Sequence, residues 1–282
     1  MFKCIIFRRV TRGSLQIYDL EKQSVLTKKE IVLMTMKGIT GLILIFSISG
    51  WTTEDTRSDK TLEYCNTFRQ IQLDIRDCVI SPDSARLAFQ DVMRNIRSEF
   101  NRDSCRAIDS TYFVYPVRCY IPRESIGGKG EGYRPDGFDL FDMNVKGSHP
   151  AHDLFVYDKN QDNIDDRTWR PVDVLSFTSG MVIATETNWQ YDSDLRGGNW
   201  IWIYDPCLDG LFYYAHNNIV KVQPGQWVNA GDKISEMGRT GFNAYKKRSP
   251  THLHMMFLKL NSEALPEPYD TYDWMMNAVI KE

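Results

Sequence analysis

The sequence lacks the features that would mark several common classes of protein. None of its six cysteines forms a Cys-x-x-Cys pair, which argues against a zinc site built from cysteine. Positive charge is not in excess, because 34 lysines and arginines face 37 acidic residues for a net charge of −3. A nucleic-acid-binding protein would carry a basic surface, so we do not expect this chain to bind nucleic acid. Hydrophobic residues at 42% and charged residues at 25% are ordinary for a globular protein.

Long apolar runs are also scarce. The run ITGLILIFSI at 39–48 follows Lys37 and precedes Ser49 and Gly50, which is the pattern of a secretory signal peptide. It is shorter than the roughly 20 residues that span a bilayer comfortably. We therefore predict a leader or signal region at 1–50, with translation starting at Met34 or Met36. This predicts a cell-envelope protein, periplasmic or secreted, whose membrane tether, if any, would be an uncleaved leader.

Export would place the cysteines in an oxidising compartment. Without the leader five cysteines remain, which is an odd number. Proximity alone suggests the pairs Cys65–Cys78 and Cys105–Cys119, but connectivity cannot be deduced from sequence.

The periodicity of apolar residues changes along the chain. Residues 58–103 have helical spacing, and Ser81 followed by Pro82 is typical of a helix start, so we expect an antiparallel helical pair. From about residue 149 short aromatic and β-branched runs are separated by turn residues, which predicts strands. The predicted fold is mainly β, an antiparallel β-sheet cradle with an N-terminal helical pair, α+β overall. The predicted divisions after the leader are a helical segment at 51–120, a β-rich domain at 121–265 and a tail with helical character at 266–282.

All five histidines lie in the β-rich part. His252 and His254, in THLHMMF, would point to the same face of a strand. His149 and Asp153, in HPAHD, would share a face in either a strand or a helical turn. His149, Asp153 and His254 together offer two nitrogens and one oxygen, a set that suits a catalytic zinc ion with a fourth position for water. His216, in phase with Tyr214 on an apolar strand, taken alone is typical of a packed residue.

The order of these motifs resembles that of the lysostaphin-type, or LytM-type, zinc metallopeptidases, which are peptidoglycan endopeptidases. The matching segments are HPAHD (149–153), GMVI (180–183), YYAHNN (213–218), VQPGQWVNAGDKISEMGRTG (222–241) and THLHMMF (251–257). The resemblance implies zinc bound by His149, Asp153 and His254, with His216 and His252 beside the metal. It also implies a LytM-like antiparallel cradle with a lipoyl-like hairpin and an open groove.

The resemblance implies an exported zinc-dependent metalloendopeptidase that hydrolyses peptide bonds of bacterial peptidoglycan, in stem or cross-link peptides, by zinc-activated water. We expect His252 to act as the general base and His216 to stabilise the oxyanion, although the two roles could be exchanged. An insertion at 243–250 (NAYKKRSP) is expected to reshape the substrate rim.

Two other interpretations of the same motifs remain. The first is a non-catalytic LytM-type module that binds or activates another wall hydrolase. The second is a lipoyl-like carrier, suggested by VQPGQWVNAGDKI at 222–234, but this stretch has no lysine at the hairpin tip to carry a group.

One acidic segment suggests a second metal. DKNQDNIDD, at 158–166, spaces Asp158, Asn160, Asp162 and Asp166 as in a short calcium loop. It lacks the central glycine and the distal glutamate of the helix–loop–helix form. These four residues are candidate Ca²⁺ ligands, and a solvated acidic turn is the other interpretation of the segment.

Overall fold

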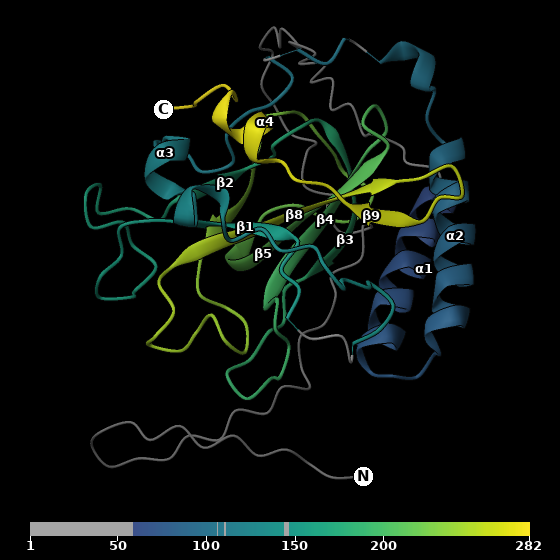
Figure 1. Cartoon of the computed structure of the whole chain (residues 1–282), viewed down its shortest axis with the longest axis horizontal. Helices are drawn as coiled ribbons and strands as arrows, with labels where there is room; N and C mark the ends of the chain where they lie inside the picture. Colours follow the sequence, from purple (N-terminus) through teal and green to yellow (C-terminus); the bar gives the residue numbers. More distant parts are fainter. Residues whose placement is uncertain (1–58, 106, 110, 144–146) are drawn as a thin grey trace, which may run out of the picture. The chain divides into compact units, whose positions relative to one another are not determined.

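The computed structural model describes residues 59–282, apart from 106, 110 and 144–146 (Figure 1). The leader predicted at 1–50 lies outside the described residues. None of the helices in the described part has the length and apolar character needed to cross a membrane.

Two long helices open the described chain, as predicted. The helices are α1 (Asp59–Arg76), α2 (Pro82–Ser98), the short α3 (Pro122–Ser125) and α4 (Tyr272–Met276), with 3₁₀ turns at Arg102–Ser104 and Gly127–Gly130. Ser81 caps α2, since its hydroxyl accepts a hydrogen bond from the Ser84 backbone N–H at 3.2 Å, and Pro82 opens the first turn. α1 and α2 lie side by side at one edge of the molecule (Figure 1).

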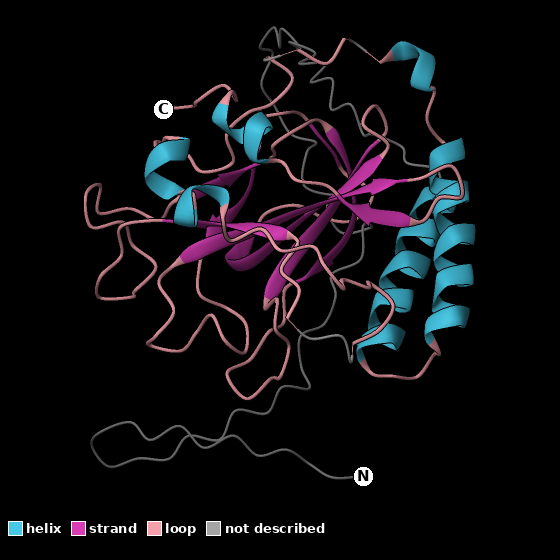
Figure 2. Ribbon diagram, viewed as in Figure 1, coloured by secondary structure: helices cyan, strands magenta, loops and turns pink. Residues whose placement is uncertain are grey.

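In the described part of the chain, nine strands form one sheet in which all the strand pairs are antiparallel (Figure 2). They are β1 (Ala151–Phe155), β2 (Asp173–Leu175), β3 (Gly180–Glu186), β4 (Asn199–Asp205), β5 (Gly210–Val220), β6 (Trp227–Val228), β7 (Lys233–Met237), β8 (His252–Leu260) and β9 (Pro266–Pro268). The main path runs β1-β8-β5-β4-β3-β6, while β7 pairs with β5 and β2, and β9 pairs with β8. The predicted antiparallel sheet with an N-terminal helical pair is confirmed.

Side-chain alternation gives the sheet two apolar faces. On β4, Ile201 and Ile203 belong to one buried cluster, whereas Trp200 and Trp202 belong to another. The first cluster is covered by residues that include Tyr115 from the segment after α2. The second is covered by the apolar sides of α1 and α2, whose buried residues include Phe68, Ile71, Phe89 and Met93.

The disulfide differs from both pairs suggested by proximity. Cys105 is bonded to Cys207, at a sequence separation of 102 and a Cα–Cα distance of 5.5 Å. Cys78 and Cys119 are exposed and not disulfide-bonded, so the pairs Cys65–Cys78 and Cys105–Cys119 are wrong. Cys65 is buried on α1 with its Sγ 3.9 Å from the Val182 carbonyl oxygen, whereas Cys78 lies beyond the end of that helix. Closeness in sequence therefore does not bring these two thiols together.

Candidate metal centre

Three side chains predicted as metal ligands converge where β1, β8 and β5 run side by side. Asp153 on β1 lies opposite His254 on β8, and His254 lies opposite Ala215 on β5. His149 precedes β1 and is held by paired backbone hydrogen bonds with Arg134. Sheet register therefore brings together residues that are about a hundred positions apart.

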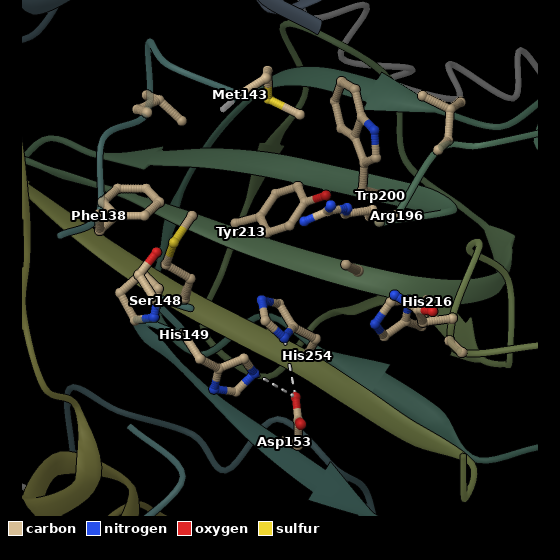
Figure 3. Close-up of a pocket in the computed structure, with 18 of the residues that line it drawn as sticks. Phe138, Met143, Ser148, His149, Asp153, Arg196, Trp200, Tyr213, His216 and His254 are labelled. Atoms are coloured by element: carbon tan, nitrogen blue, oxygen red, sulfur yellow. Dashed lines mark hydrogen bonds and ion pairs between the residues drawn. The ribbon is translucent and has the colours of Figure 1, made fainter. Parts of the chain in front are cut away.

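The carboxylate of Asp153 is the centre of this group. Its Oδ1 lies 3.0 Å from His254 Nδ1 and 3.4 Å from His149 Nε2 (Figure 3). One ligand atom from each of the three residues lies within 4.8 Å of the other two. Burial acts to raise the pKa of the Asp153 carboxyl, but hydrogen bonds from His149 and His254 hold it below its ordinary value. Asp153 is therefore an anion that faces imidazole nitrogens.

The donor set fits a catalytic zinc ion. Two imidazoles and one carboxylate are a known ligand set for zinc enzymes, which leave a further position for water. His149 Nδ1 donates to the Gly132 carbonyl oxygen at 2.9 Å, so its Nε2, which faces Asp153, is the nitrogen that would exchange its proton for a metal ion. Each of the three side chains is between one fifth and one third exposed, so the group is open to a ligand.

His216 and His252 lie beside this group. His252 Nδ1 donates to the Pro250 carbonyl oxygen at 2.7 Å, and His216 Nδ1 donates to that of Thr240 at 2.8 Å. Only an N–H can donate to a carbonyl, so Nε2 is the bare nitrogen in both neutral rings. The two ring centroids are 4.8 Å apart, and His252 Nε2 is 3.8 Å from Asp153 Oδ1. Burial lowers the pKa of both residues, most strongly that of His216, which keeps them neutral.

A β-bulge turns His216 toward the metal ligands. By simple alternation it would share the opposite face of the sheet with Tyr214, as the sequence indicates. The register of β5 against β4 shifts here, because Tyr214 lies opposite Ile201 while Asn217 lies opposite Asn199. His216 adopts a φ of 68°, in the left-handed region that is unfavourable for non-glycine residues. Strained backbone of this kind is frequent at functional sites.

All five of these residues line one groove of about 770 Å³. The predicted insertion at 243–250 contributes to the rim through residues that include Asn243 and Arg248. Aromatic side chains from β4 and β5 line its floor, and Figure 3 labels Tyr213 and Trp200 among them. The metal group therefore lies in a groove large enough for a peptide.

Comparison with known proteins identifies this part of the chain. Residues 162–266 match the model of peptidase family M23. This segment is therefore similar to family M23 peptidases. The matched range contains His216, His252 and His254, whereas His149 and Asp153 precede it.

Solved structures similar to the chain include several peptidases. One is the antimicrobial peptidase lysostaphin from Staphylococcus simulans, with 21% identity and a TM-score of 0.37 over 59% of this chain and 56% of that one. A lytM protein from Ruminococcus gnavus has 23% identity and a TM-score of 0.41 over 80% and 90% of the two chains. A zinc-containing peptidase from Vibrio cholerae has 19% identity and a TM-score of 0.35 over 62% and 41%. The match thus spans little more than half of lysostaphin's length, and no curated protein matches the chain.

The predicted calcium loop at 158–166 is not supported. Its four proposed ligands are Asp158, Asn160, Asp162 and Asp166. Asp158 accepts hydrogen bonds from the Thr251 hydroxyl at 2.6 Å and from two backbone N–H groups of its own loop, and Asp166 accepts from the Lys159 N–H at 2.9 Å. Within the described part of the chain, these carboxylates do not converge as the ligand atoms of His149, Asp153 and His254 do. Their oxygens instead hold the loop in shape.

Proposed function

We propose that this protein is an exported zinc metalloendopeptidase that hydrolyses peptide bonds in stem or cross-link peptides of bacterial peptidoglycan. The observation that carries the proposal is the convergence of His149, Asp153 and His254 within 4.8 Å in one groove, in a chain whose residues 162–266 match peptidase family M23. An antiparallel sheet beside the groove suits an extended peptide, which can be held by backbone pairing.

The chain's own residues can perform the proton transfers of amide hydrolysis. A zinc ion held by His149, Asp153 and His254 would supply Lewis-acid activation of a water molecule and of the scissile carbonyl. His252 presents a bare Nε2 beside this group and is our general base: it takes a proton from water and returns it to the leaving amine. His216 also presents a bare Nε2, so it can donate to an oxyanion only after it has taken a proton from solvent, and a neighbouring anion favours that protonated form. The two roles are therefore exchangeable, and His216 is our assignment for the oxyanion.

The test compares zinc content and hydrolysis in the same variants. His216→Ala and His252→Ala should each keep stoichiometric zinc but release fragments from purified peptidoglycan at least about 10²-fold more slowly. His149→Ala should lose both zinc and activity. His152→Gln is the matched histidine control, because His152 is buried away from the groove and bonds Asp270 at 2.8 Å, and it should keep zinc.

Zinc-loaded wild-type protein that binds peptidoglycan but never cleaves it would overturn the proposal. That result would support a non-catalytic LytM-type module that binds or activates another hydrolase. Loss of zinc from both His216→Ala and His252→Ala would show instead that the ligand assignment is wrong.

A further inference from the structure

The helical pair covers the face of the sheet that carries the metal centre. Trp200 and Trp202 on β4 share a buried cluster with Met256 on β8, which lies on the same face as His254. The apolar sides of α1 and α2 belong to the same cluster. The helices and the metal ligands therefore divide one face of the sheet between them.

Polar contacts fix this pair to the sheet at several points. Arg69 of α1 donates to the Thr185 carbonyl oxygen at 3.1 Å and pairs with Glu186 at 3.3 Å. Arg97 of α2 holds Asp209 through two hydrogen bonds of 2.9 and 2.7 Å and also donates to the Asn261 carbonyl oxygen. All the described residues fall in one compact unit. The helical pair is therefore fixed against the sheet.

The last turn of α1 reaches the groove itself. Gln72 and Arg76 line the same cavity as His254, with the aromatic side chains of Trp202 and Tyr213 also on its surface. Among the described residues, Gln72 Nε2 has no hydrogen-bond partner although this nitrogen is fully buried. An amide donor buried without an acceptor is unfavourable by about 1–3 kcal/mol, so native structures usually provide it with a partner. The Gln72 amide turns readily about its last side-chain bond, so this donor can swing to the groove surface, where a ligand can provide that acceptor.

We propose that Gln72 is a substrate-binding residue, whose side-chain amide donates to a backbone carbonyl oxygen of an extended peptide running from the metal centre over Tyr213 and Trp202. This inference rests on the proposed function and adds to it a selection for substrate length. A peptide must extend far enough from the scissile bond to reach α1, so short substrates do not gain this contact.

Gln70 provides a matched control on the same helix. Its Nε2 donates to Asp74 Oδ1 at 2.7 Å, and it does not line the groove. Gln72→Glu keeps the size of the side chain but removes both N–H donors and adds a negative charge, so a loss that it shares with the neutral Gln72→Ala is the loss of the donor.

The experiment measures kcat and KM on cross-linked stem-peptide dimers and on a truncated dipeptide amide. Gln72→Ala and Gln72→Glu should raise KM for the dimer about 3- to 10-fold, with kcat within about twofold of wild type, and should not change cleavage of the dipeptide. Gln70→Ala should leave both constants unchanged. An unchanged KM for the dimer in both Gln72 variants, or an equal loss on both substrates, would overturn the inference.

A binding assay keeps this result distinct from failure of the proposed function. Zinc-loaded His252→Ala protein is titrated with a synthetic stem tetrapeptide, using the fluorescence of the groove tryptophans. Adding Gln72→Glu should weaken binding by the same 3- to 10-fold factor, about the value of one hydrogen bond. If wild-type protein shows no cleavage while this weakening of binding is seen, the peptidase function fails and the role of Gln72 stands. Equal affinities of the two proteins overturn the role of Gln72.

Discussion

Zinc should stabilise this fold measurably, and Asp153 should be responsible for most of the effect. A ligand that binds only the native state at about 100 times its Kd contributes about 2.7 kcal/mol. A domain of this size gains about 2–4 °C in Tm for each kcal/mol, so zinc should raise Tm by about 5–11 °C. Asp153→Asn keeps the side-chain shape but removes the anion that lies 3.0, 3.4 and 3.8 Å from nitrogens of three imidazoles.

The loss in the variant can be estimated from the same relation. Even outer-shell partners of a metal are worth roughly 10- to 100-fold in affinity, so loss of a direct carboxylate ligand should weaken zinc at least about 100-fold. At the same zinc concentration the stabilisation then falls to about 0.4 kcal/mol, or about 1 °C.

Differential scanning calorimetry with and without a chelator measures both shifts. Because each protein is compared with its own metal-free form, any change in intrinsic stability cancels. His216→Ala and His252→Ala should keep the full zinc shift. A full shift in Asp153→Asn would refute the ligand assignment, as would a shift lost equally in His252→Ala.

Three further predictions concern the frame around this centre. Asp209→Asn leaves Arg97 without its carboxylate and should lower the free energy of unfolding, measured by chemical denaturation, by about 2–3 kcal/mol. The control Asp91→Asn, in the exposed pair with Arg94, should change it by less than about 0.5 kcal/mol, and equal effects would refute the anchoring of α2. Cys105→Ser should lower stability by about 2–5 kcal/mol, and a stability equal to that of wild type would contradict the bond to Cys207. Millimolar calcium should leave Tm unchanged, and a clear rise would restore the calcium loop.

The convergence of His149, Asp153 and His254 is the part of this structure that the sequence predicts best. Strand alternation places residues two apart on the same face, and imidazole and carboxylate side chains are recognisable as ligands wherever they occur. The sequence does not contain the register between strands, which is what sets Asp153 opposite His254. Only the combination of several weak motifs indicated that these segments meet.

His216 shows where alternation fails. The phase of its strand predicts a packed residue beside Tyr214, but one extra residue in the ladder turns it to the groove. The predicted cysteine pairs and the predicted calcium loop are also not found, because both depend on which distant segments pack together. Closeness in sequence suggested the cysteine pairs, and the spacing of acidic residues suggested the calcium loop. In the structure Cys207 is bonded to Cys105, and Asp158 accepts a hydrogen bond from the hydroxyl of Thr251.

The position of the groove follows from how the central strands are covered. All seven residues of β4 are buried, so both faces of the sheet must be covered at this point. One face is covered by residues such as Tyr115 and the other by α1 and α2. Beyond the helices that second face opens, and there the metal ligands lie beside Tyr213. The apolar side of a helix in the sequence shows that it must be buried, but not against what. The same helical pair that completes the core therefore also sets where the groove ends, and Gln72 lies at that boundary.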